Sequence, residues 1–365
     1  MNQRSCPITV IHLRLICFSL MICCMDQSLH GETAVSFSVL NDQTLQELVP
    51  DNEGVPDSAK QIDNNPEKTS PTSKTGDRIW LLNTRHLISR ASQVNLGSPA
   101  FKIYQLDSAT PAQAVERESF LEKISERRKS VIYIHGNRFT ADDAIERGCL
   151  VHEKIATNEV KQPIDWIIWS WASDKKGVLV HDARLKANRT EGQGLYLAWL
   201  LKEFAKKQIP TTLIGYSFGG RIVTGALHAA AGGKLGGVSI KGEPTVGAPF
   251  NAALIAPAID SLWLDQRGYH RLAPQNLDSL TLLYNRRDAI LKRYWRIDQI
   301  QGRLALGLTG PRSFAPRHDG SLLPVRSHDC SDEIGVKHDE LYYFHKSCHA
   351  GRDLARLINQ QPSTQ

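Results

Sequence analysis

The chain has 365 residues, 41% of them hydrophobic, which is enough to build a large core in one large or two ordinary domains. Its 44 Lys and Arg residues against 38 Asp and Glu residues give a formal net charge of +6 without a dense basic run. The composition therefore predicts a soluble globular protein and gives no sign of nucleic-acid binding.

The first 25 residues predict export. Arg4 precedes an apolar stretch at 13–25, which has the length of a signal-peptide core and is shorter than a membrane-spanning helix needs. His12 and Arg14 interrupt the apolar pattern, and no clear cleavage site follows. We expect a secreted, periplasmic or membrane-anchored protein, and an uncleaved anchor or a wrongly chosen start codon are the alternatives.

The rest of the chain divides into a linker and one domain. Residues 26–76 are polar and rich in turn-forming residues, so they predict a disordered linker. In 77–365, short apolar runs alternate with helical patterns, which is typical of a mostly parallel sheet with helices on both faces. Residues 296–325, rich in Gly, Pro and Arg, are expected to form an insertion or a long loop.

The elements of this α/β domain follow from apolar runs and from apolar residues at i, i+3, i+4 spacing. The predicted strands are 79–85, 101–106, 130–136, 165–171, 211–217, 241–247 and 280–285. The predicted helices are 118–129, 141–156, 192–208, 220–232 and 340–359.

Ser217 is the candidate nucleophile. It lies in the pattern Gly-x-Ser-x-Gly between an apolar strand and a helix of small residues. The pattern alone is weak evidence, but a nucleophile elbow needs this strand-turn-helix context and a backbone with positive φ. Side chains at Gly215 and Gly219 would collide in such a turn. The alternative is an ordinary serine in a turn or at a helix N-cap.

A serine nucleophile needs two N–H donors for the negative oxygen that develops during attack. The backbone amide of Phe218 is the first candidate. The loop after the strand 130–136 supplies the second, from Asn137 or Arg138, and we favour Asn137. A plain turn in which His135 packs or caps is the alternative.

The base and the acid are expected downstream of the serine, with the acid first. Asp288 follows an apolar strand and a short polar turn, which predicts a place at the carboxyl edge of the sheet. The alternatives for the acid are Asp260, Asp265 and Asp278, and an ion pair with Arg286 or Arg287 is the other interpretation of Asp288.

His338 is the candidate base, because it stands immediately before the predicted last helix. His345 and His349 are four residues apart, so on that helix they would share a face and suit packing or capping. The alternative histidines are His270, His318, His328, His345 and His349.

The tail is also rich in metal-binding residue types. His345, Cys348 and His349 are close in sequence, but their spacing matches no standard zinc pattern, so no metal or organic cofactor is expected. In an exported protein, Cys330 and Cys348 could pair across a loop, while Cys149 stays buried and reduced.

Residues 78–360 resemble the α/β-hydrolase superfamily, and within it a bacterial branch of α/β hydrolases of unknown function. The motifs that carry the resemblance are VIYIHGNRFTADDA, WIIWSWASD, LIGYSFGGRIVTGAL, LLYNRRDAIL, KHDELYYF and RDLARLI. The resemblance implies the α/β-hydrolase fold and a triad of Ser217, Asp288 and His338. Two features depart from that branch: Tyr216 stands where histidine is common, and 296–325 has no counterpart.

The sequence thus predicts a serine hydrolase that cleaves an ester or related acyl bond in a small-molecule or lipid-like substrate. Tyr216, Trp171 and His135 are candidates for the acyl pocket, with core packing as the alternative. A catalytically inactive binding module at the cell envelope is one other interpretation. A hydrolase of amide or thioester bonds is another, because this scaffold supports many reactions.

Overall fold

The computed structural model describes residues 76–106, 112–125, 129–177, 179–298 and 302–360. These residues belong to one compact unit, which spans 66–365. The predicted leader and nearly all of the predicted linker lie outside the described residues. Within the described part of the chain, no helix has both the length and the apolar character that crossing a membrane requires.

A sheet of nine strands, in the order β3-β2-β1-β5-β4-β6-β7-β8-β9, organises the described residues. Strand β2 runs antiparallel to β1 and β3, and every other neighbouring pair is parallel. The strands are β1 (Arg78–Asn83), β2 (Lys102–Leu106), β3 (Gln113–Val115), β4 (Lys129–Ile134), β5 (Ile164–Ser170), β6 (Thr211–Tyr216), β7 (Phe250–Ile255), β8 (Leu277–Tyr284) and β9 (Val325–Asp329).

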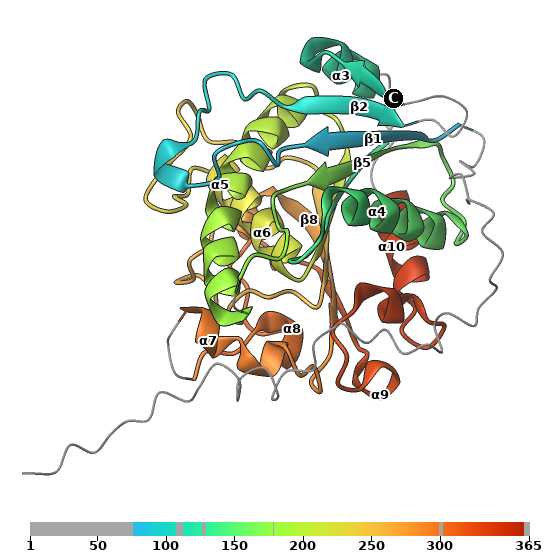
Figure 1. The fold of residues 1–365 in the computed structure, drawn as a ribbon, viewed down its shortest axis with the longest axis vertical. Helices are drawn as coiled ribbons and strands as arrows, with labels where there is room; N and C mark the ends of the chain where they lie inside the picture. The colour runs from blue at the N-terminus through green and yellow to red at the C-terminus, as the bar shows by residue number, and fades with distance from the viewer. Residues whose placement is uncertain (1–75, 107–111, 126–128, 178, 299–301, 361–365) are drawn as a thin grey trace, which may run out of the picture. The chain divides into compact units, whose positions relative to one another are not determined.

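Helices cover both faces of this sheet. Helices α5 and α6 pack together on one face, and α4 and α10 pack together on the other (Figure 1). The α-helices are α3 (Arg117–Ile124), α4 (Ala141–Ala156), α5 (Leu179–Lys206), α6 (Phe218–Ala230), α7 (Trp295–Asp298), α8 (Leu306–Thr309), α9 (Ser331–Ile334) and α10 (Ala350–Gln360). The 3₁₀ helices are η2 (Ala91–Gln93), η3 (Ala273–Asn276), η4 (Leu291–Arg293) and η5 (Glu340–Phe344).

The central strands are mostly apolar because both of their faces are covered by helices. All residues of β4, β5, β6 and β7 are buried. Strand β6 lies between β4 and β7, so its carboxyl end, which leads into α6, lies near the centre of the sheet edge. This order, with an antiparallel strand near one edge and helices on both faces, is the predicted α/β-hydrolase fold.

Two predicted elements are wrong. Residues 241–247 are not a strand; they are mostly exposed and contain Pro244, whereas the neighbouring β7 is fully buried. The predicted helix 340–359 is broken, because His349 has a φ of 56° immediately before α10 begins. Consequently His345 and His349 do not share a helix face.

The described parts of the predicted insertion, 296–325, pack against the loop that follows β7. The Leu306 amide donates to the Ile259 carbonyl at 2.8 Å, and Ala305 forms a β-bridge with Asp260. Within this segment the structure contains the end of α7 and the whole of α8. The segment therefore lies near the edge of the sheet at which β7 ends.

Candidate active site

Ser217 occupies a sharp turn between β6 and α6. Its backbone has φ 51° and ψ −114°, a conformation that a residue with a side chain adopts at a cost of roughly 1–3 kcal/mol. The Ser217 amide donates to the Ile255 carbonyl at 3.0 Å, and the Ser217 carbonyl accepts from the amides of Gly220 (3.0 Å) and Ala258 (3.1 Å). Contacts with the end of β7 thus hold the turn in this strained form.

The two glycines of the motif are sterically required. A Cβ atom on Gly219 would lie 2.1 Å from the carbonyl oxygen of Ile134, which belongs to β4. A Cβ atom on Gly215 would lie 2.8 Å from backbone atoms of Gly219 and Gly220. Both distances are far below van der Waals contact, so α6 can approach the sheet this closely only with glycine at both positions.

A hydrogen-bonded chain joins Ser217 to His338 and Asp288. The distance from His338 Nε2 to Ser217 Oγ is 2.9 Å, and the distance from His338 Nδ1 to Asp288 Oδ2 is 2.6 Å. Ser217 is only 6% exposed and Asp288 is fully buried. These are the three side chains that the chain order predicted, and the fold brings them together from the ends of β6 and β8 and the loop before η5.

The Asp288 carboxylate is fixed by the backbone as well as by His338. Its Oδ1 atom accepts hydrogen bonds from the amides of Ile290 and Leu291, both at 2.9 Å. Its neighbour Arg286, one of the two alternative ion-pair partners, instead pairs with Asp329 at 3.0 Å. Asp288 is therefore oriented with its Oδ2 atom toward the imidazole.

The carboxylate also determines the protonation of His338. An Nδ1–H that donates to Asp288 leaves Nε2 as the acceptor for the Ser217 hydroxyl. Burial lowers the pKa of His338, but the charge and hydrogen bond of Asp288 outweigh it, so the net pKa lies above 6.5. A raised pKa makes the imidazole a stronger base once it is neutral.

The alternative acids are engaged elsewhere. Asp260 forms an ion pair with Arg303 at 2.7 Å, and Asp278 forms one with Arg317 at 2.7 Å. The Asp265 carboxylate accepts from the Arg267 amide at 3.1 Å. Asp288 is the acid that the structure brings to His338.

The alternative histidines also have other contacts. His270 is hydrogen-bonded to Thr224, and His318 lies beside Gly247. His345 pairs with Glu333, and the ring of His328 lies against that of His349. Among the described residues, no group of three or more His, Cys, Asp and Glu side chains is arranged as a metal site. Cys149, Cys330 and Cys348 are free thiols.

The loop after β4 lies against the nucleophile. A Cβ atom on Gly136 would be 3.3 Å from the Cβ of Ser217. Within the described residues, the amides of Phe218 and Asn137 donate to no backbone or side-chain acceptor, whereas the Arg138 amide donates to the Ser173 carbonyl at 2.8 Å. Of the two amides that the sequence left open for the second donor, that of Asn137 is the one to which the described residues offer no acceptor.

Arg85 clamps this loop to the loop after β5, and sequence reasoning missed it. Its Nη2 atom donates to the carbonyls of Phe139 (3.0 Å) and Thr140 (2.6 Å). Its Nε and Nη1 atoms donate to Ser170 Oγ and Asp174 Oδ2, both at 2.8 Å. No local motif marks Arg85, because its partners lie 54 to 89 residues away in the chain.

The predicted pocket residues His135 and Trp171 are fully buried and bind each other. His135 Nε2 accepts from the Trp171 amide at 3.2 Å, and the Trp171 indole donates to the His135 carbonyl at 3.0 Å. Burial lowers the pKa of His135 to about 3, so its imidazole is neutral. These contacts join the ends of β4 and β5; a role in binding an acyl group stays a prediction.

Tyr216, the third predicted pocket residue, contacts the loop that carries the base. Its hydroxyl donates to the His338 carbonyl at 2.9 Å, and the two rings lie 5.3 Å apart. Its side chain is buried, and burial is the main cause that raises its pKa well above 10. Tyr216 therefore donates a hydrogen bond as a neutral phenol and supports the position of His338.

A second buried carboxylate lies beside the base, and sequence reasoning missed it too. Glu340 is fully buried, and the Tyr133 hydroxyl lies 2.7 and 2.8 Å from its two oxygens. Arg147 on α4 approaches Glu340 at 3.7 Å and pairs with Asp339 at 2.8 Å. Burial is the main cause that raises the pKa of Glu340, to about 8.

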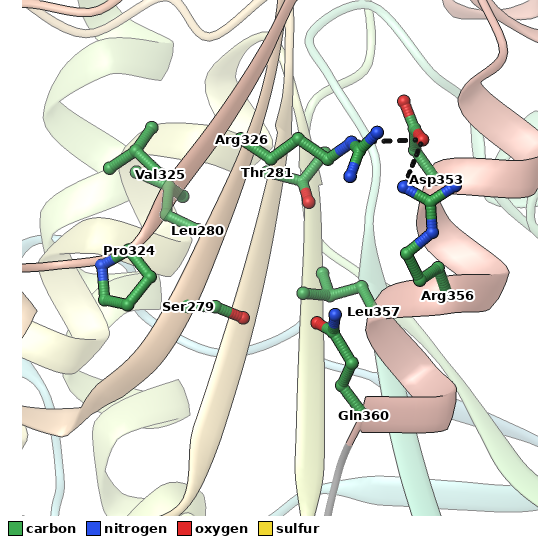
Figure 2. A pocket seen from close by; sticks show the side chains of 10 residues that line it. All are labelled: Ser279, Leu280, Thr281, Pro324, Val325, Arg326, Asp353, Arg356, Leu357 and Gln360. Carbon is green, nitrogen blue, oxygen red and sulfur yellow. Dashed lines mark ion pairs between the residues drawn. The ribbon is translucent and has the colours of Figure 1, made fainter.

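A separate cavity of about 290 Å³ lies between β8, β9 and α10. Figure 2 shows Arg326 and Arg356 both directed at Asp353, with ion-pair distances of 3.4 and 3.5 Å. Ser279, in the first half of β8, is also in its wall, whereas Asp288 follows the carboxyl end of that strand. The cavity is therefore displaced from the triad along β8, and no triad residue lines it.

No protein-family model matches the chain, and no curated protein matches it in sequence. The narrower resemblance to a bacterial branch stays an expectation. Several solved structures are similar to this chain, three of them as follows. Esterase B from Lactobacillus rhamnosis with a C6-C4 SN3 inhibitor is 14% identical in sequence. The match covers 87% of this chain and 92% of that chain, with a TM-score of 0.37.

The same esterase with a C4-C4 SN3 tributyrin phosphonate is 11% identical (87% of this chain, 91% of that chain, TM-score 0.37). An IroE-like serine hydrolase from Shewanella oneidensis is 13% identical (71% of this chain, 77% of that chain, TM-score 0.33). These likenesses concern the fold, so the function must be argued from the geometry around Ser217.

Proposed function

We propose that this protein is a serine hydrolase that cleaves an ester or related acyl bond through an acyl-enzyme on Ser217. The observation that carries the proposal is the chain of hydrogen bonds from Ser217 through His338 to Asp288, with Ser217 on a strained turn. A serine hydroxyl is a poor nucleophile without a base, and this chain supplies a base with a fixed tautomer.

The chemistry begins with His338 Nε2 accepting the Ser217 proton as Oγ attacks the substrate carbonyl carbon. The negative oxygen that forms is held by the amides of Phe218 and Asn137. Asp288 stabilises the imidazolium during this step without taking its proton. His338 then gives the proton to the leaving oxygen, the alcohol departs, and water attacks the acyl-enzyme by the same route in reverse.

The substrate we propose is a small-molecule or lipid-like acyl compound, and the proposed steps involve only the triad, two backbone amides and water. On the basis of the leader alone, we propose that the protein acts outside the cytoplasm, either released or membrane-anchored. Thioester and amide substrates use the same nucleophile, so a panel of aryl esters, thioesters and peptides identifies the bond that is cleaved.

A fluorophosphonate probe tests the proposal, because it reacts covalently only with an activated serine. We expect the wild-type protein to be labelled and Ser217→Ala to be unlabelled, while Ser321→Ala, a change at an exposed serine, labels as the wild type does. His338→Ala should reduce the labelling rate by at least about 10³-fold. An unlabelled wild type would instead indicate a binding module on an α/β-hydrolase fold.

A further inference from the structure

Two buried cysteines lie at the two ends of the segment that carries His338. Cys330 follows β9 directly, and Cys348 lies two residues before α10. Their exposed fractions are 2% and 0%, and both are free thiols. Residues 331–347, which include the base, lie between them in the chain.

The fold brings the two cysteines to adjoining positions, because the rings of His328, two residues before Cys330, and His349, directly after Cys348, lie 5.7 Å apart. The two thiols share a hydrogen bond. Each cysteine is also held by its backbone. The Cys330 amide donates to the Tyr284 carbonyl at 2.9 Å, and the Cys348 amide donates to the His345 carbonyl at 3.1 Å. The pair is thus anchored at the end of β8 on one side and before α10 on the other.

We propose that Cys330 and Cys348 form a disulfide that closes a covalent ring around the His338 loop. The oxidant is a small disulfide such as oxidised glutathione, which reaches the buried thiols when the segment between them opens locally. The Cys348 thiolate attacks one of its sulfurs, the S–S bond breaks, and one glutathione thiolate leaves. Cys330 then loses its proton and attacks the Cys348 sulfur, which releases the second glutathione; two protein thiols are oxidised and one disulfide is reduced.

The hydrogen bond between the two thiols favours this order of attack. The hydrogen bond from Cys330 lowers the pKa of Cys348, and the same contact together with burial raises the pKa of Cys330. Since the thiolate is the nucleophile, Cys348 reacts first. Cys149 on α4 is the internal control, because burial raises the pKa of its half-buried thiol to about 11 and so favours the thiol over the reactive thiolate.

The ring restricts the unfolded chain, so the disulfide should stabilise the folded state. It also ties β9 to the start of α10 while His338 stays in contact with Asp288. This proposal does not depend on the catalytic one, because bond formation is measured directly and not through activity.

The test uses the full chain, treated with oxidised or reduced glutathione under native conditions, blocked with N-ethylmaleimide and digested with trypsin. We expect oxidation to link the peptides 327–337 and 347–352 with the loss of two hydrogens, and Cys149 to remain alkylated. The same oxidation in urea provides the detection control, because unfolded chains form all pairs, including this one.

Absence of the linked peptide in the native sample, or a native link from either cysteine to Cys149, would overturn the proposal. Oxidation should also raise the melting temperature by roughly 5 °C. Cys330→Ser and Cys348→Ser should show no shift between the oxidised and reduced samples. An oxidised wild type that melts at the reduced temperature would show that the ring does not stabilise the loop.

Discussion

The imidazole of His338 is hydrogen-bonded to Asp288 at 2.6 Å, and the other oxygen of that carboxylate is occupied by two backbone amides. The carboxylate can therefore rotate neither away from the base nor toward solvent. This makes Asp288 the residue whose replacement should have the most specific effect on the proposed chemistry.

Replacing Asp288 with Asn should lower kcat/KM for an aryl ester by roughly 10³- to 10⁴-fold, because the amide can orient the wrong histidine tautomer and cannot stabilise the imidazolium. Asp278→Asn is the matched control, since Asp278 is paired with Arg317 and should leave activity nearly unchanged. Circular dichroism should show both variants folded. Comparable rate losses in the two would contradict the role assigned to Asp288.

The rate of acylation should depend on pH through His338. The base works only when neutral, and although burial lowers its pKa, Asp288 raises it to a net value above 6.5. The fluorophosphonate labelling rate should therefore rise with pH through a midpoint above 6.5. Asp288→Asn removes the main raising interaction, so its residual activity should show a midpoint at lower pH. An unchanged midpoint would indicate that another group titrates.

Glu340 should make the stability of the protein depend on pH. Burial raises its pKa to about 8 in the folded state, compared with an ordinary value of 4.5. Between these values the folded state keeps a proton that the unfolded chain has lost. The contribution of Glu340 to the free energy of unfolding is therefore complete below pH 4.5 and is lost as the pH rises through 8.

Glu340→Gln should remove this dependence, because glutamine accepts the Tyr133 hydrogen bond but does not titrate. The melting temperature of the variant relative to the wild type should increase from pH 5 to pH 8.5, by an amount that corresponds to a few kcal/mol. Glu153→Gln, on the exposed side of α4, should track the wild type at every pH. Parallel curves for wild type and Glu340→Gln would refute the assignment.

Arg85 should act on the reaction without touching the substrate. Its guanidinium joins the carbonyls of Phe139 and Thr140, in the loop after β4, to the loop after β5. The loop after β4 also contains Asn137, whose amide is the proposed second donor to the oxyanion. Lysine keeps the charge but lacks the fork of donors. Arg85→Lys should lower kcat by on the order of 10-fold and change KM little, because the loss concerns transition-state stabilisation.

The control for Arg85→Lys is Arg117→Lys, which alters a surface ion pair with Glu118. That change should leave both constants as in the wild type. A rise in KM with constant kcat in Arg85→Lys would show instead that the loop contributes to ground-state binding.

Whether a feature could be predicted from the sequence depends on how far apart in the chain the interacting residues are. Ser217, Asp288 and His338 each stand beside a strand end or a helix start, so the chain order selected three residues that lie in one hydrogen-bonded chain. The predicted α/β-hydrolase fold is confirmed, because buried parallel strands have distinct apolar runs.

Features at the edges of the sheet, and features that depend on contacts between residues far apart in the chain, were not predictable. Strand β9 was missed because an edge strand is largely exposed and its sequence, VRSHD, has no apolar run. Strand β7 was misplaced because Asn251 interrupts its apolar pattern, although it is buried between β6 and β8. Arg85 and Glu340 gain their roles only when strands far apart in the chain become neighbours.

The close approach of α6 to β4 gives the sharpest steric prediction. A methyl group on Gly219 would lie 2.1 Å from the Ile134 carbonyl oxygen, so Gly219→Ala must displace either the start of α6 or the loop after β4. We expect a loss of more than about 2 kcal/mol in the free energy of unfolding and a loss of labelling at Ser217. Gly97→Ala, where the added methyl group meets only the end of the Asn95 side chain at 3.5 Å, should change neither quantity. If Gly219→Ala kept the wild-type stability and labelling rate, the tight turn that presents the Ser217 hydroxyl would not be the one described.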